Sequence, residues 1–135
     1  MPFTEKETEY LKSQHFGRLA TIGRNGTPHN VPVGVHLNTE LGTIDVVGRG
    51  LGKSRKYRDV QLNEAVAFVV DDLASVDPLT PRGIEIRGLA RALTEGGHDN
   101  AMIRIVPTRI ISWGIEGHWS EGPAARDVAV EAPSA

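Results

Sequence analysis

The 135-residue chain contains no cysteine, which excludes disulfide bonds, thiolate nucleophiles and cysteine-based zinc or iron–sulfur sites. It also lacks a long apolar run, and its first residues are charged. We therefore expect neither a signal peptide nor a membrane span, and we expect a cytoplasmic protein. The net charge of -2 argues against a general nucleic-acid-binding protein, because such proteins carry a strong basic excess.

Glycine and proline are abundant, with 15 and 8 residues, and this composition favours frequent turns and many short strands. Thr4 and Glu7 form a capping-box pattern that predicts a helix over residues 5–13. Asn25 and Gly26 predict a two-residue hairpin turn. A second helix is expected over residues 53–62. Strands are expected at residues 16–23, 28–38, 43–48, 65–71, 83–94, 102–106 and 109–115, with a loop at residues 74–82.

Residues 28–38 alternate between two faces, with Val31, Val33, Val35 and Leu37 on the apolar one. Pro32 cannot donate to a sheet ladder, so this strand is expected at a sheet edge or with a bulge. The hairpin signals favour an all-β barrel of about six or seven antiparallel strands over a doubly wound sheet. We expect one domain over residues 1–115 and a loosely ordered tail over residues 116–135, in which residues 125–128 could dock.

The basic segment, residues 49–58, is the most informative part of the chain. Cations at a helix start oppose the helix dipole and repel one another, so they suit a place where an anion binds. The Ser54 hydroxyl and the free N–H groups of the first turn suit a phosphate. The alternative is a solvated turn whose cations pair with Asp59 or Glu64. The segment holds five of the chain's 15 Lys and Arg residues: Arg49, Lys53, Arg55, Lys56 and Arg58.

Other motifs in the sequence give weaker evidence about function. Residues 48–54 read G-x-x-x-G-K-S, one residue shorter than the phosphate loop of nucleotide triphosphatases, and the chain has no room for their parallel sheet. The histidines have no spaced partners, so we expect no metal site. We interpret His36 as a surface histidine in preference to a proton donor, and His29 as solvent-facing. Asp71 and Asp72 are interpreted as an acidic turn at a strand end. No catalytic side chain can be named.

The start of the second helix, Ser54-Arg55-Lys56, followed by the strand at residues 65–70, resembles the flavin-phosphate segment of the pyridoxamine 5′-phosphate oxidase-like superfamily. Residues 17–22, 25–28 and 30–33 resemble the same superfamily, so the likeness covers residues 16–92, with a weaker echo at residues 111–114. Residues 71–78 and 81–88 resemble its actinobacterial branch, which uses the deazaflavin coenzyme F420.

The resemblance implies a six-stranded antiparallel split barrel of the FMN-binding kind, and a symmetric homodimer with two cofactor sites at its interface. It implies an F420H2-dependent reductase of an unsaturated or carbonyl small molecule. An FMN-dependent oxidase or reductase, and a non-catalytic F420- or flavin-binding protein, stay open as alternatives. The implied cofactor contacts are Asn30, Val31, Pro32, Val33, Arg49, Lys53, Ser54, Arg55 and Lys56, with Trp113 of the partner subunit against the ring.

The chain departs from the true pyridoxamine phosphate oxidases at two places. Val31 and His36 stand where those enzymes carry an Arg and a Lys on the second strand. Their Arg-rich C-terminal substrate segment is also absent. We therefore do not expect a role in vitamin B6 synthesis. A strand with few flavin-phosphate ligands is in keeping with a branch that holds a different cofactor.

Overall fold

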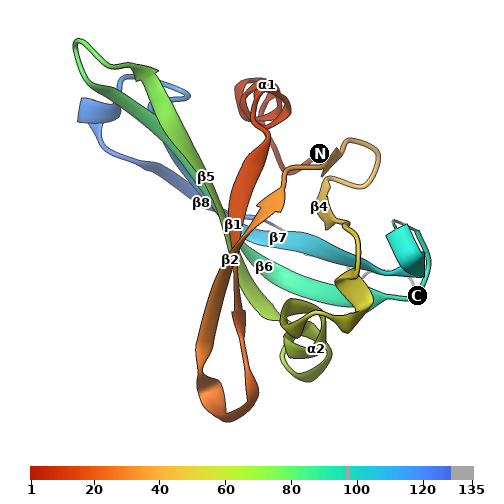
Figure 1. The fold of residues 1–135 in the computed structure, drawn as a ribbon. Helices are drawn as coiled ribbons and strands as arrows, with labels where there is room; N and C mark the ends of the chain where they lie inside the picture. The colour runs from red at the N-terminus through yellow and green to blue at the C-terminus, as the bar shows by residue number, and fades with distance from the viewer. Residues whose placement is uncertain (97, 129–135) are drawn as a thin grey trace.

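The computed structural model describes residues 1–96 and 98–128, which form one curled antiparallel sheet with two small helices (Figure 1). The strand order is β2-β1-β5-β6-β7-β4-β3, and β8 pairs with β7 outside this path. The sheet forms a half-barrel, so the all-β split-barrel prediction is confirmed. It contains eight strands because the chain adds the short β3 and β8. The strands are β1 (Phe16–Ile22), β2 (Pro28–Gly34), β3 (Leu37–Asn38), β4 (Thr43–Val46), β5 (Ala65–Ser75), β6 (Thr80–Leu93), β7 (Met102–Trp113) and β8 (Ala124–Asp127).

Both helices lie where the capping signals predict them, at opposite ends of the barrel (Figure 1). In α1 (Glu5–Ser13), Thr4 accepts from the Glu7 amide, and the Glu7 side chain accepts from the Thr4 amide. The second helix, α2 (Arg55–Leu62), starts later than expected because a 3-10 turn, η2 (Leu51–Lys53), precedes its cap. Short 3-10 turns also occur at η1 (Arg24–Gly26), η3 (His98–Asn100) and η4 (Trp119–Glu121). Within the described residues no helix is long and apolar enough to cross a bilayer.

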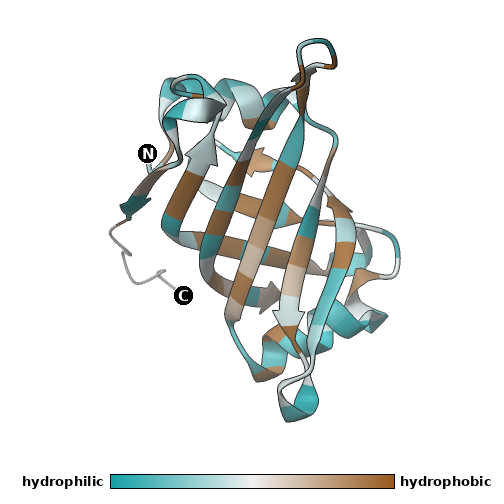
Figure 2. Cartoon of the chain, turned by 90° about the vertical axis from the view of Figure 1, so that its left-hand side faces the viewer, coloured by the Kyte–Doolittle hydropathy of each residue, from teal (hydrophilic) through white to brown (hydrophobic). Residues whose placement is uncertain are grey.

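Apolar residues alternate along the long strands and fill the barrel (Figure 2). The predicted apolar face of β2 is confirmed, because Val33 is buried and Val31, Val35 and Leu37 pack against the core. Burial of such side chains is the main favourable term in folding. The fully buried centre of the core consists of Leu19, Ile44, Phe68, Val70, Ile84, Ile86, Ile103, Ile105 and Ile110.

The strand expected at residues 28–38 is broken in two. The amide of Val35 donates to the carbonyl of His15, whereas the carbonyl of His36 accepts from the amide of Asp45. The chain therefore leaves β1 and joins β4 within two residues, which separates β2 from β3. Of the edge and the bulge that Pro32 allowed, the structure has the edge, and among the described strands β2 pairs with β1 alone.

The prediction of two separate strands around Pro107 is wrong, because β7 runs without a break from Met102 to Trp113. In this strand β4 pairs with residues 103–105 and β8 with residues 109–112, so the missing N–H of Pro107 falls between these two partners. On the other side the register with β6 shifts beside Gly88. A Cβ on Gly88 would lie 2.3 Å from the carbonyl oxygen of Val106, so only glycine fits this bulge.

Two other segments contain more strand than expected. The predicted loop at residues 74–82 is shorter, because β5 continues to Ser75 and β6 begins at Thr80. Beyond residue 115, β8 pairs with β7, and the amide of Val128 donates to the carbonyl of Thr108. The expected docking of residues 125–128 is therefore seen. The remainder of the predicted loose tail, residues 129–135, lies outside the described residues.

Candidate functional site

The basic segment starts α2, and Ser54 has a structural role there. The Ser54 hydroxyl donates to the carbonyl of Leu51 at 2.5 Å, and its oxygen accepts from the amide of Tyr57 at 3.4 Å. Its proton is therefore engaged within the fold. The first-turn amides of Arg55 and Lys56 have no intrahelical acceptors, as at any helix start. These amides, rather than the Ser54 hydroxyl, are the donors that the cap leaves for an anion.

Acidic side chains lie near this segment, because the charge of Arg55 acts on Asp59 and the Asp99 carboxylate accepts from the Gly50 amide, but they form no close ion pair with its cations in the described part of the chain. Among the described residues, none of the five forms an ion pair within 4.0 Å. Arg58 instead donates to the carbonyl of Lys53 at 3.3 Å. A close ion pair of these cations with Asp59 or Glu64, the alternative considered for this segment, is therefore not formed, although the charge of Arg55 acts on Asp59. Lys56 is half-buried, whereas Arg49, Lys53, Arg55 and Arg58 are exposed.

The turn before α2 is already seen to hold a carboxylate oxygen. Gly50 adopts a left-handed conformation with φ of 72°, which favours glycine. Its amide donates to Oδ2 of Asp99 at 3.0 Å. The N–H of Gly50 therefore points to a place where an acidic oxygen lies, whereas the amides of Leu51 and Lys53 donate to carbonyls of the turn itself.

The predicted cofactor contacts on β2 lie in the β1–β2 hairpin, beside α2. The side chains of Asn30 and Pro32 are exposed, Val31 is half-buried and Val33 is buried. Because β2 is an edge strand, backbone groups on its outer side meet no other strand among the residues that the structure describes. Such groups are free to meet the polar rim of a planar ring.

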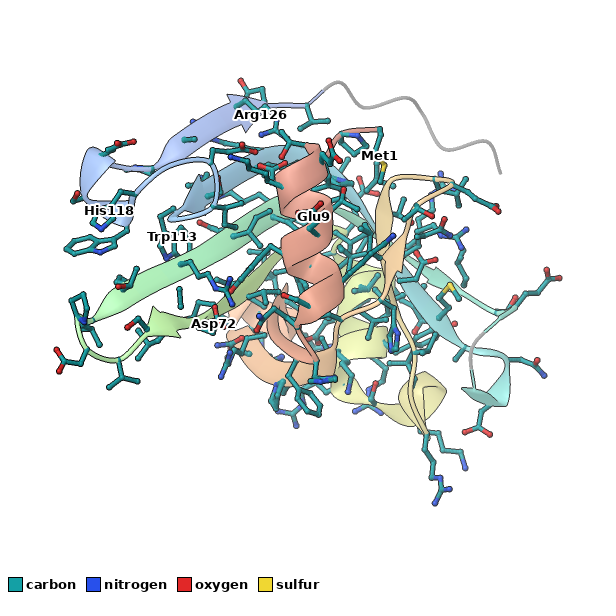
Figure 3. All side chains as sticks on the ribbon, turned by 90° about the horizontal axis from the view of Figure 1, so that it is seen from above. Met1, Glu9, Asp72, Trp113, His118 and Arg126 are labelled. Atoms are coloured by element: carbon teal, nitrogen blue, oxygen red, sulfur yellow. The ribbon has the colours of Figure 1, made fainter. Side chains whose placement is uncertain are left out.

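Trp113, by contrast, is not brought near the basic segment of its own chain. It is the last residue of β7, at the end of the barrel away from α2, where it lies near His118 (Figures 1 and 3). The indole packs against β6 opposite Gly83, where a Cβ would lie 2.4 Å from Cζ2 of Trp113. It borders a hollow of about 260 Å³. A contact between Trp113 and a cofactor on α2 therefore needs a second subunit and stays a prediction.

A buried polar cluster beside the basic segment was not predicted. Asp59 of α2 is 3% exposed, and its Oδ2 lies 2.6 Å from Nδ1 of His29 and accepts from the hydroxyl of Thr21 at 2.7 Å. We call Asp59, His29 and Thr21 the Asp59 cluster. Burial by itself would raise the pKa of Asp59, but the hydrogen bonds from His29 and Thr21 and the charge of Arg55 hold it below its ordinary value.

The expectation that His29 faces solvent is therefore wrong, because α2 covers this end of β2. One signal in the sequence could have found it. The alternation that places Val31 and Val33 inward also places His29 inward, two residues earlier. The expected two-residue turn would have paired His29 with Ile22, but the loop spans residues 23–27 and pairs His29 with Thr21, so that partner was decided by the structure.

The other acidic candidates are structural. Asp71 and Asp72 lie within β5 rather than in a turn, so the expected acidic turn is wrong. Asp72 accepts two hydrogen bonds from Arg82 and one from Tyr10, which keeps its pKa below the ordinary value. His36 is exposed where β2 gives way to β3. The described part of the chain holds no group of three or more side chains suited to a metal ion.

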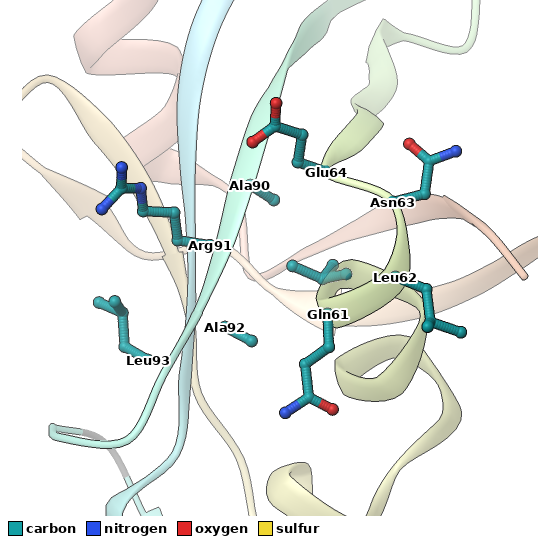
Figure 4. Close-up of a pocket in the computed structure, with 9 residues that line it drawn as sticks. Gln61, Leu62, Asn63, Glu64, Ala90, Arg91, Ala92 and Leu93 are labelled. Carbon is teal, nitrogen blue, oxygen red and sulfur yellow. The ribbon is translucent and has the colours of Figure 1, made fainter. Parts of the chain in front are cut away.

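A hollow larger than the one beside Trp113 lies at the other end of α2 from the basic segment (Figure 4). It is an open groove of about 640 Å³ between the end of α2 and β6. It contains none of the predicted cofactor contacts, so the basic segment and the groove share a helix but no residue. Its lining consists of Val60, Gln61, Leu62, Asn63, Glu64, Ala90, Arg91, Ala92 and Leu93.

Known proteins share both the sequence and the fold. A reductase of 5a,11a-dehydrotetracycline and 5a,11a-dehydrooxytetracycline from Streptomyces rimosus is 51% identical over 137 residues, which cover 97% of this chain and 96% of that protein. A conserved hypothetical protein from Mycobacterium tuberculosis superposes with a TM-score of 0.71 at 22% identity, covering 98% of this chain and 95% of that one. An FAD-binding protein from Mycobacterium smegmatis gives 0.60 at 22% identity, covering 82% and 93%.

The two structural likenesses show the fold alone, because both identities are low. The likeness to the reductase extends over nearly the whole of both chains and supports an oxidoreductase. The family described as pyridoxamine 5′-phosphate oxidase matches residues 3–133. By this match and by its split barrel, the chain belongs to the pyridoxamine 5′-phosphate oxidase family.

Proposed function

We propose that this protein is an F420H2-dependent reductase that acts on an electron-poor carbon–carbon double bond in a flat polycyclic molecule of the dehydrotetracycline kind. The substrate class rests on the 51% identity with the Streptomyces rimosus reductase. The observation that supports this cofactor is the group of cations around the start of α2, none of which forms an ion pair with another described residue.

The donor set suits coenzyme F420 better than FMN. FMN carries one phosphate, whereas F420 carries a phosphodiester and an acidic glutamyl tail. Arg55, Lys56 and the first-turn amides of α2 would hold the phosphate. Arg49, Lys53 and Arg58 exceed what one phosphate needs and would hold the carboxylates of the tail. Arg55 and Arg58 lie three residues apart, so they share one side of the helix.

The protein supplies binding and orientation in this proposal, and the reduced deazaflavin supplies the hydride. The free edge of β2 at Asn30 to Val33 would lie along the ring. Trp113 of the partner subunit would close the site from the other side, which requires a homodimer. Exposed apolar side chains that a second subunit could cover include Phe16, Leu62, Leu73, Val76, Leu79, Leu89 and Trp119.

The test is a titration of the cofactor-free protein with F420 and with FMN in the same buffer, followed by a turnover assay. We expect tighter binding of F420, and oxidation of F420H2 that depends on added 5a,11a-dehydrotetracycline. If FMN binds about tenfold or more tightly, a difference of about 1.4 kcal/mol, the protein is an FMN enzyme instead. Tight binding of F420 with no turnover of any enone would indicate a cofactor-binding protein.

A further inference from the structure

The proposed site is built from two elements that are joined through one buried contact. The phosphate donors belong to the first turn of α2, and the ring contacts belong to β2. Asp59 lies one helical turn after Arg55, on the same side of α2, and reaches across to β1 and β2 through Thr21 and His29. The Asp59 cluster is therefore the polar link between the two halves of the site.

Apolar packing alone could attach α2 to the barrel, and Tyr57 and Val60 already pack into the core. A carboxylate that is 3% exposed is costly to bury, and it is tolerated only where its hydrogen bonds are well formed. Both bonds here end on the same oxygen, Oδ2. Hydrogen bonds are directional, whereas apolar packing is not. These two bonds therefore fix the position of α2 along the β1–β2 hairpin, and do more than hold the helix against it.

The backbone is shaped to receive the histidine ring. A Cβ on Gly23 would lie 2.4 Å from Cε1 of His29, so the ring packs directly against the backbone at this glycine. Ring, carboxylate and hydroxyl are thus held from three elements, β2, α2 and β1. The side chain of His29 keeps 24% of its surface exposed, whereas that of Asp59 keeps only 5%.

We propose that Asp59, through His29 and Thr21, is a positioning residue that sets the first turn of α2 at one fixed place against β2, so that the phosphate and the ring of the cofactor are bound together. This inference rests on the proposed function. Its effect falls on cofactor affinity, through the basic segment, and none of the three side chains need touch the cofactor.

The test compares cofactor affinity and thermal stability in matched variants. Asp59→Asn and His29→Leu break the link, whereas His29→Asn keeps a donor near the place of Nδ1. The control is Asp45→Asn, since Asp45 is also a buried carboxylate but pairs with Arg104 between β4 and β7, away from α2. We expect Asp59→Asn and His29→Leu to raise the Kd for F420 by about tenfold, His29→Asn to restore most of the affinity, and Asp45→Asn to lower Tm with little change in Kd.

A second measurement separates positioning from general loosening. If the cluster acts through the first turn of α2, His29→Leu should weaken binding much less when Lys56 is already replaced by alanine. Unchanged Kd in both Asp59→Asn and His29→Leu overturns the inference while the proposed function stands. The inference is also overturned if Asp45→Asn raises the Kd for F420 as much as Asp59→Asn does, at an equal loss of Tm. A wild-type protein that binds neither F420 nor FMN overturns the proposed function and the inference together.

Discussion

Arg126 of β8 forms a two-pronged ion pair with Glu7 of α1, across 119 residues of sequence. Its Nη2 lies 2.6 Å from Oε1 of Glu7 and its Nη1 lies 2.9 Å from Oε2. Glu7 is fully buried, at 0% exposure, and the same carboxylate closes the capping box of α1. One carboxylate therefore caps the first helix and holds the last strand against it.

Replacing Arg126 with alanine should destabilise the fold more than any surface ion pair does. It leaves a buried carboxylate without its partner, and we expect the free energy of unfolding to fall by about 3 kcal/mol, the lower end of what breaking a buried ion pair costs. Arg109→Ala is the matched control, because Arg109 of β7 pairs with Asp127, the neighbour of Arg126 on β8, and the Asp127 side chain is 84% exposed. That change should cost less than about 1 kcal/mol. Urea unfolding measures both, and equal losses would contradict the account of Arg126.

Arg55→Ala and Lys56→Ala should each weaken cofactor binding by about 1.5–3 kcal/mol, the usual contribution of a hydrogen bond to a charged group. Binding to the wild type should also weaken as salt is added, because the contact is electrostatic. Titration at two salt concentrations measures both effects. Lys12→Ala serves as a control, since Lys12 lies in the last turn of α1, at the other end of the barrel from α2. Unchanged affinity in both α2 variants would place the phosphate elsewhere.

Acid should destabilise the protein through its buried carboxylates. The bonds from Arg104, Asn38 and Thr43 overcome burial and lower the pKa of Asp45, and those of His29 and Thr21 do the same for Asp59. The unfolded chain therefore binds more protons than the folded one as pH falls below about 4. The stability that these two carboxylates contribute is therefore fully present above that pH. It is lost as the pH falls toward their lowered pKa values in the folded protein.

Asp45→Asn tests this pH dependence. The variant should be less stable at neutral pH, and its stability should fall less steeply in acid, because one of the shifted carboxyls is gone. Thermal unfolding at several pH values between about 3 and 7 measures the slope, a range that spans the ordinary aspartate pKa. Parallel curves for the variant and the wild type would show that Asp45 does not contribute to acid unfolding.

The protein should be a homodimer at micromolar concentration. Several large apolar side chains stay in water in the single chain, among them Phe16 at 65% and Val76 at 77% exposure. Leu73, Val76 and Leu79 are all exposed along the β5–β6 hairpin, and apolar side chains gathered in this way are more typical of an interface than of a free surface. Sedimentation velocity measures the state directly. A monomer would also remove the basis for a contact between a cofactor and Trp113 of the partner subunit.

Local features of the fold could be predicted from the sequence because the groups that make them lie within a few residues of each other. The capping box of Thr4 and Glu7, the turn at Asn25 and Gly26, and the cap at Ser54 all have this character. The edge position of β2 follows from one missing N–H, at Pro32. The basic segment was visible for the same reason, since its charges are neighbours along the chain.

Features that depend on distant partners were decided by the tertiary structure. The break between β2 and β3 depends on where His15 and Asp45 lie, and the uninterrupted β7 depends on Pro107 falling between β4 and β8. The Asp59 cluster joins residues 30 and 38 positions apart, and no local pattern states that α2 will cover His29. The amino-acid sequence thus determined the charges and turns of this protein. Only the packing of the barrel decided which buried carboxylate meets which partner, because a buried charge is stable only beside groups that the fold brings to it.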